Sequence, residues 1–181
     1  PVIRRAEMLG ELLKLKKISI AVSGSHGKTT TCSILGMILS EAKLQPTLVI
    51  GGIVKNIDSN SILGEGDIIV VEADEFDRSF LSLKPTMGII NNLDLEHLDY
   101  YKNIEEIKNA FLTFSNLLPF YGILGVCCDD KYINEILPNL NRPIKKFGFD
   151  ETADIRATNI SHEKFKSSFD LYIDGAYADR F

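Results

Sequence analysis

The residues best suited to phosphate chemistry lie in one run, Val22-Ser23-Gly24-Ser25-His26-Gly27-Lys28-Thr29-Thr30. Gly24 and Gly27 allow backbone N–H groups to turn inward around phosphate oxygens, and the start of a following helix adds a partial positive charge. Lys28 supplies a full positive charge for the β- and γ-phosphates, from a side chain expected at an open crevice, and Thr29 offers a hydroxyl group to Mg²⁺. The general pattern has a glycine five residues before Gly27, where Val22 stands. A glycine-rich turn without a ligand is the alternative.

A second group of chemistry-bearing residues is acidic, and it forms the run Glu72-Ala73-Asp74-Glu75-Phe76-Asp77 after the apolar stretch 68–71. In an open parallel sheet, ligands bind beyond the carboxyl ends of the strands, so we expect these acids and the phosphate loop to face one crevice. Glu72 directly follows the predicted strand and is best placed to bind Mg²⁺ together with Thr29 and phosphate oxygens. A solvated acidic turn is the alternative.

A third polar segment, Asn91 to Asp99, follows the apolar stretch 87–90. His97, within this segment, could be a metal ligand, a proton carrier or a structural residue. Its place after a predicted strand is the same as that of the acidic run, and this places it among the candidate site residues.

The spacing of apolar residues predicts the elements that position these groups. Helices are expected over 4–15, 28–42, from Asn103 onward, and 130–137. Strands are expected over 18–22, 47–50, 68–71, 87–90, 122–127 and 144–149, and 51–66 reads as a long polar loop. Alternating strands and helices predict the α/β class, with a phosphate-loop-type, mostly parallel sheet flanked by helices. A small antiparallel addition is expected at the C-terminal end, because Asp174-Gly175 is a hairpin turn pair.

Composition limits the kinds of protein that the sequence can be. The 181 residues are 45% hydrophobic and 25% charged, which is typical of a globular protein. The formal charge of −5 argues against nonspecific nucleic-acid binding, and no apolar run approaches the roughly 20 residues of a membrane span. Three cysteines are too few for a disulfide framework, which favours a reducing, cytoplasmic compartment. The chain begins at Pro1 and ends after a strand-like stretch, so we expect a piece of a larger protein.

Four stretches, taken in order, resemble the Mur ligase family. They are Arg5-Ala6-Glu7-Met8-Leu9, Gly24 through Thr31, Glu72-Ala73-Asp74-Glu75 with Asp77 and Ser79-Phe80-Leu81, and Asn92 through Asp99. The resemblance covers roughly 1–150, and His26 with the Glu-Ala-Asp-Glu run favours the branch that adds L-alanine. Ser25 and Glu96 stand where the family usually has threonine and aspartate.

The resemblance implies a role for each candidate residue. Lys28 and the loop residues Gly24, Ser25, His26, Gly27, Thr29 and Thr30 would bind ATP, with Asn92 beside the nucleotide. Thr29 and Glu72 would bind one Mg²⁺, and Glu72 with His97 a second. Lys28, Glu72 and His97 would be the catalytic residues, and Asn60 would lie near the sugar-nucleotide substrate.

The resemblance also implies an activity, which is ATP-dependent carbon–nitrogen ligation of L-alanine to UDP-N-acetylmuramate through an acyl phosphate. This reaction belongs to cytoplasmic peptidoglycan synthesis, and so to cell-wall biogenesis, cell shape and division. The chain would be the central ATP-binding domain over 1–181, made of an N-terminal helix (1–17), a parallel core (18–150) and an antiparallel tail (151–181). The N-terminal UDP-binding domain and the C-terminal domain would be missing from it, so this piece alone is not expected to ligate.

Three other functions remain open. One is a recycling ligase that attaches a preformed tripeptide to the same acceptor. The second is a P-loop ATPase switch, in which Glu72 would activate water. The third is a nucleotide-dependent binding module without catalysis.

Overall fold

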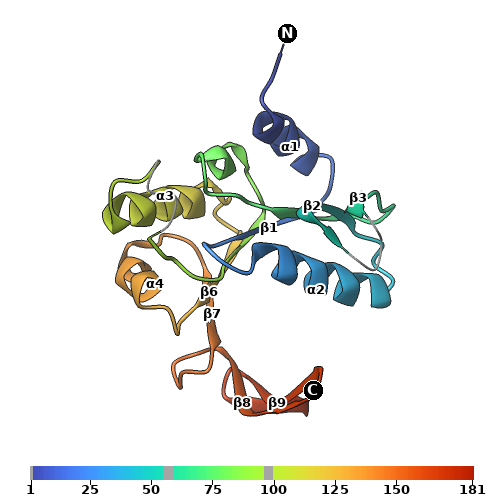
Figure 1. Ribbon diagram of the computed structural model, residues 1–181, viewed down its shortest axis with the longest axis vertical. Coiled ribbons are helices and arrows are strands. Elements are labelled where there is room, and N and C mark those ends of the chain that lie inside the picture. Colours follow the sequence, from blue (N-terminus) through green and yellow to red (C-terminus); the bar gives the residue numbers. More distant parts are fainter. Residues whose placement is uncertain (1, 55–58, 96–99) are drawn as a thin grey trace.

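The computed structural model describes residues 2–54, 59–95 and 100–181 and arranges them around one sheet (Figure 1). The helices are α1 (Arg5–Leu13), α2 (Lys28–Glu41), α3 (Ile104–Leu117) and α4 (Lys131–Ile136), with 3-10 helices η1 (Ser79–Ser82) and η2 (Leu137–Asn139). The strands are β1 (Ile18–Ser23), β2 (Thr47–Val54), β3 (Ser59–Ile62), β4 (Ile68–Glu72), β5 (Met87–Ile90), β6 (Ile123–Cys127), β7 (Ile144–Gly148), β8 (Ile155–Glu163), β9 (Lys166–Ile173) and β10 (Ala176–Arg180). Their order in the sheet is β10-β9-β8-β7-β6-β5-β1-β4-β2-β3.

The centre of the sheet is parallel, and β1 lies between β4 and β5. These strands are rich in β-branched residues, and Val22, Val70 and Val71 are fully buried. From β1 the chain builds the sheet outward in both directions, so the carboxyl ends of β1, β4 and β5 meet at a topological switch point. This is the edge at which ligands bind in open α/β sheets.

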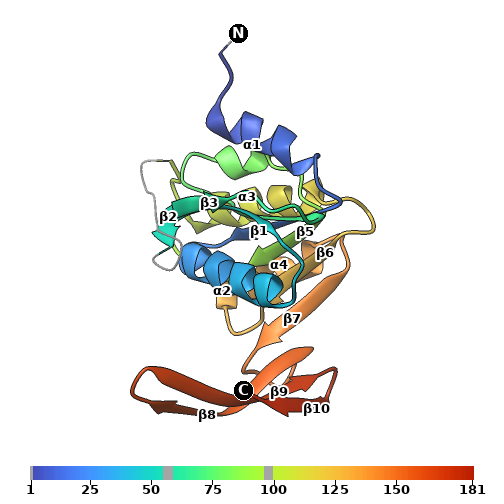
Figure 2. The ribbon, with the colours of Figure 1, turned by 90° about the vertical axis from the view of Figure 1, so that its right-hand side faces the viewer.

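Helices cover both faces of the sheet (Figure 2). On one face, Cys32 of α2 packs with Ile20, Val22 and Val70 of the central strands. On the other face, α1, α3 and α4 contribute to a larger apolar cluster, which includes the ring of Phe80 stacked on Phe114 at 5.1 Å. The predicted α/β class is confirmed. None of the helices that the structure describes has both the length and the apolar character of a membrane span.

The prediction of a long polar loop over 51–66 is wrong. The strand β2 continues through Gly51 and Gly52 to Val54, and β3 returns beside it in the antiparallel direction. The two glycines weaken the apolar pattern of the sequence, but they do not end the strand. Their small size leaves room for the side chains of Glu72 and Thr29, which come close to this part of β2. A Cβ on Gly51 would lie 3.1 Å from a Glu72 carboxylate oxygen, and one on Gly52 would lie 3.3 Å from Thr29 Cγ2.

The C-terminal strands extend the same sheet. β8 begins in parallel pairing with β7, and β8, β9 and β10 are then paired in the antiparallel direction. Asp174 and Gly175 both have positive φ, as the predicted hairpin turn requires. Figures 1 and 2 show this hairpin region at the end of the molecule opposite to α1.

Candidate functional site

The phosphate loop connects β1 to α2, as the sequence predicted. Gly24 has φ +130° and Gly27 has φ +79°, conformations that side-chain-bearing residues rarely adopt. A Cβ on Gly24 would also lie 3.0 Å from the backbone nitrogen of Asn92, so this position needs glycine for space as well. Gly27 is the N-cap of α2, and the first backbone N–H groups of that helix have no partner inside it. The loop therefore presents the positive end of α2 at the switch point.

Asn92 shapes this loop from the end of β5. Its side-chain Oδ1 accepts a hydrogen bond from His26 N at 2.7 Å, and its Nδ2 donates to His26 O at 3.2 Å. Its backbone oxygen accepts from Ser25 N at 3.1 Å. The amides of Ser25 and His26 are thus already bonded, which leaves the amides at the start of α2 as the best donors for phosphate oxygens.

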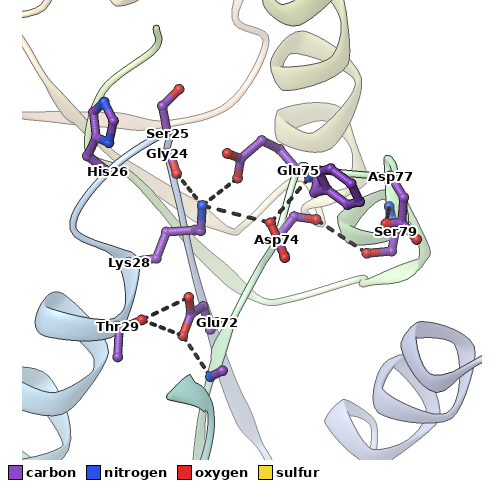
Figure 3. Close-up of polar contacts among 12 residues, drawn as sticks. Gly24, Ser25, His26, Lys28, Thr29, Glu72, Asp74, Glu75, Asp77 and Ser79 are labelled. Carbon is purple, nitrogen blue, oxygen red and sulfur yellow. Dashed lines mark hydrogen bonds and ion pairs between the residues drawn. The ribbon is translucent and has the colours of Figure 1, made fainter. Parts of the chain in front are cut away.

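Lys28 crosses the base of the loop. Its Nζ donates to the Gly24 carbonyl oxygen at 2.9 Å and to Glu75 Oε2 at 2.8 Å, and Asp74 Oδ1 lies 3.8 Å away (Figure 3). The Lys28 side chain is 11% exposed and that of Glu75 is 3% exposed. Lys28 lines the hollow at the start of α2, as the expected crevice requires, but its ammonium group is more buried than expected because the turn after β4 packs Glu75 against it.

Thr29 and Glu72, which the sequence predicted to share a metal ion, are in direct contact (Figure 3). Thr29 Oγ1 donates to the Glu72 carboxylate, with both carboxylate oxygens at 3.0 Å. Gly51 N donates to Glu72 Oε2 at 2.7 Å and fixes the carboxylate from the β2 side. One hydroxyl and one carboxylate fit Mg²⁺, which usually takes its remaining ligands from substrate phosphates and water. Within 2–54, 59–95 and 100–181 there is no cluster of three acidic, histidine or cysteine side chains for a metal ion.

Burial changes the ionisation of two groups around the site. Burial, followed by the charge of Glu72, raises the pKa of the Cys32 thiol to about 12, so this thiol is protonated at neutral pH. Burial also raises the pKa of Tyr101 to about 12. Asp77 has a lowered pKa, chiefly because Ser79 donates a hydrogen bond to its carboxylate.

Two hollows meet at Glu72. The first, of about 330 Å³, is lined by Glu72 and by the loop residues Ser25, His26, Gly27, Lys28, Thr29 and Thr30. The second, of about 460 Å³, is lined in part by Glu72, Asp77, Arg78 and the two arginines at the start of α1, Arg4 and Arg5. A phosphate donor in the first hollow and an acceptor in the second would therefore face the same carboxylate.

Two predicted site residues are not placed in this cluster. Asn60 lies in β3, and it is absent from the described residues that line either hollow. His97 lies outside the residues that the structure describes. Sequence reasoning also missed Glu75 as the partner of Lys28, although Glu75 belongs to the acidic run that it had singled out. Nothing in that run indicates which of its acids is buried.

Comparisons with known proteins identify the family of this chain. Residues 22–179 match the family described as the Mur ligase middle domain. The chain is 50% identical over 172 residues to the UDP-N-acetylmuramate–L-alanine ligase of Syntrophus aciditrophicus, and 49% identical over 169 residues to that of Desulfotalea psychrophila. The matched regions cover 95% and 93% of this chain, but only 36% and 37% of those relatives. The chain thus spans little more than a third of their length.

Solved structures of Mur ligases share the fold. The UDP-N-acetylmuramate:L-alanyl-γ-D-glutamyl-meso-diaminopimelate ligase of Neisseria meningitidis matches with a TM-score of 0.85 at 26% identity, over 99% of this chain and 59% of that one. The UDP-N-acetylmuramate-alanine ligase of Thermotoga maritima matches with a TM-score of 0.79 at 24% identity, over 97% and 39%. The MurF ligase of Thermotoga maritima, solved in complex with ADP, matches with a TM-score of 0.76 at 19% identity, over 98% and 44%.

Proposed function

Because the chain belongs to the Mur ligase family, we propose that it is the central, ATP-binding part of an enzyme that joins L-alanine to UDP-N-acetylmuramate. The names of its relatives at 49 to 50% identity support this substrate pair. The observation that carries the proposal is the contact of Thr29 with both carboxylate oxygens of Glu72, beside the phosphate loop and Lys28. That contact places a hydroxyl and a carboxylate beside the Lys28 ammonium group and the N-terminus of α2, at one rim of the sheet.

The proposed reaction has two steps, and both require alignment of the reactants and neutralisation of charge. A carboxylate is a poor electrophile at neutral pH, so the γ-phosphoryl group of ATP is first transferred to the acceptor carboxylate, which gives an acyl phosphate and ADP. The amine of L-alanine then attacks the acyl carbon, and phosphate leaves as the amide forms. The protein must align donor and acceptor and neutralise the charge that develops on the phosphoryl oxygens.

Residues of this chain meet both demands. The backbone N–H groups at the start of α2 and the Lys28 ammonium bind the phosphates and balance their charge. Glu72 separates the two hollows, so we place the acceptor carboxylate on the side of the larger hollow. Thr29 and Glu72 would bind Mg²⁺, which would supply positive charge to neutralise the phosphate charge that develops during transfer.

The remaining sequence predictions are part of the same proposal. His97 would add a ligand for a second Mg²⁺, Asn92 would contribute to nucleotide binding through the loop that it shapes, and Asn60 would lie near the sugar nucleotide. The whole enzyme would act in cytoplasmic peptidoglycan synthesis, with flanking domains that supply the UDP site and the rest of the ATP and amino-acid sites. The chain alone would not ligate.

Glu72→Gln in the complete ligase is expected to raise the Mg²⁺ concentration for half-maximal turnover by about 10- to 100-fold, since it removes the charge that attracts the metal ion. Asp67→Asn is the matched control, because Asp67 precedes β4 at the opposite end of the strand, where it pairs with Lys17 on the surface. A Mg²⁺ titration measures both variants. Identical titrations for Glu72→Gln and the wild type would contradict the metal role of Glu72.

Three measurements on the complete protein separate the other functions. A recycling ligase is the second candidate, because the Neisseria meningitidis tripeptide ligase shares this fold at a TM-score of 0.85. Turnover of the complete protein with the tripeptide rather than L-alanine would favour it. Phosphate release without any muramate acceptor would favour an ATPase switch, and unchanged ATP with all substrates present would favour a binding module.

A further inference from the structure

Glu75 is a buried carboxylate that contacts the lysine of the phosphate loop. Its side chain is 3% exposed, and its Oε2 accepts a hydrogen bond from Lys28 Nζ at 2.8 Å. The neighbouring Asp74 is 60% exposed, and its carboxylate oxygen lies 3.8 Å from the same nitrogen, beyond hydrogen-bond distance. Of these two neighbouring acids, Glu75 is therefore the one whose contact can orient Lys28.

The turn that carries Glu75 is itself fixed. The backbone oxygen of Glu75 accepts a hydrogen bond from Tyr101 Oη at 2.7 Å and another from Arg78 N at 3.0 Å. Tyr101 is completely buried, and the Arg78 guanidinium lies 5.2 Å from the centre of its ring. The Tyr101 hydroxyl group is a donor at neutral pH, since even the ordinary pKa of tyrosine is 10.0 and burial raises it to about 12.

We propose that Glu75 is a positioning residue, which acts through Lys28 and aims its ammonium group at the transferring phosphoryl group. This inference rests on the proposed function. A lysine ammonium has three N–H groups. Two of them are directed by fixed acceptors, the Gly24 carbonyl oxygen and Glu75 Oε2, and the tetrahedral geometry of the nitrogen then sets the direction of the third. A lysine without Glu75 would keep its charge and lose this direction.

The same carboxylate has a cost for nucleotide binding. Glu75 places a negative charge within hydrogen-bond distance of the group that must attract phosphate, so it weakens the attraction of the site for ATP. Loss of Glu75 therefore has two opposite effects on ATP binding in the ground state. The site attracts phosphate more strongly without the negative charge, and it binds phosphate less well because Lys28 is no longer oriented. The transition state depends more strongly on orientation. Loss of Glu75 should therefore lower kcat and leave KM for ATP nearly unchanged.

The test is steady-state kinetics of the complete ligase with Glu75→Gln, which keeps the size of the side chain and removes its charge. We expect kcat to fall at least fivefold, with KM for ATP within twofold of the wild type. Glu135→Gln is the matched control, because Glu135 pairs with another largely buried lysine, Lys108, which is 10% exposed and lies on α3. Glu135→Gln should leave both kinetic constants unchanged.

A second variant guards against a folding defect. Tyr101→Phe removes only the hydroxyl group that donates to the Glu75 backbone. It should lower kcat in the same direction by a smaller factor, again without a change in KM. Circular dichroism of both variants should match that of the wild type.

The outcomes separate this inference from the proposed function. A fall in kcat of less than fivefold for Glu75→Gln, a rise in KM at unchanged kcat, or an equal loss in Glu135→Gln would each overturn the role of Glu75. If Lys28→Met, measured beside them, also retains wild-type turnover, then the proposed function fails as well. If Lys28→Met is inactive, only the role of Glu75 is overturned.

Discussion

Lys28→Met is expected to lower the turnover of the complete ligase by at least about a hundredfold, which is the usual effect of removing a group that stabilises transition-state charge. Methionine has nearly the length of lysine and lacks its charge, so the substitution tests the ammonium group rather than the space that it fills. The Lys28 Nζ lies at the base of the loop, beside the hollow in which the phosphates of a nucleotide would bind. Turnover is measured at saturating ATP, acceptor and L-alanine.

Lys16→Met is the control for this variant. Lys16 is another partly buried lysine whose Nζ donates to two backbone oxygens, those of Gly64 at 2.8 Å and Gly66 at 2.7 Å. It follows α1 and contributes to neither hollow among the described lining residues. Its loss should leave turnover unchanged. Turnover of Lys28→Met within threefold of the wild type would mean that the loop has been assigned wrongly.

Lys28→Met is also expected to destabilise the fold around the loop by about 3 kcal/mol, since it leaves the buried carboxylate of Glu75 without its counter-charge. The double variant Lys28→Met/Glu75→Gln removes both charges and should recover most of that loss. Native-state hydrogen exchange at the amides of β1 and α2, in the complete protein, measures the free energy of local opening around the loop.

A double variant less stable than Lys28→Met alone would contradict the coupling between the two side chains. Lys28→Met with wild-type protection would contradict the burial of the pair. The experiment also matters for the kinetic test, because a loss of turnover in Lys28→Met is a loss of function only if the protein remains folded at the assay temperature.

Much of the site followed from local rules that the sequence contains. The left-handed turns at Gly24 and Gly27 follow from residue type, and the start of α2 follows from the apolar spacing after Lys28. The nearness of Thr29 and Glu72 was predictable because the carboxyl ends of parallel strands lie at one edge of a sheet, and the structure adds that β1 and β4 are neighbours. These predictions needed only the parallel direction of the strands and turn chemistry.

Other features depend on tertiary packing that no local pattern encodes. Glu75 meets Lys28 through a turn after β4 that is held in part by Tyr101, a residue 26 positions further along the chain. Asn92 bonds the loop backbone through the geometry of two adjacent strand ends. The continuation of β2 past Gly51 was missed because glycine usually weakens a strand, whereas here its small size makes room for Glu72.

The most direct test is a crystal structure of the complete ligase with Mg²⁺ and a nonhydrolysable ATP analogue. We predict the terminal phosphates in the hollow at the start of α2, with an oxygen within about 3.2 Å of Lys28 Nζ. We also predict a metal ion bound by Thr29 Oγ1 and the Glu72 carboxylate. A triphosphate bound away from this rim, or a Lys28 that contacts only Glu75 and Gly24 when nucleotide is present, would contradict the account.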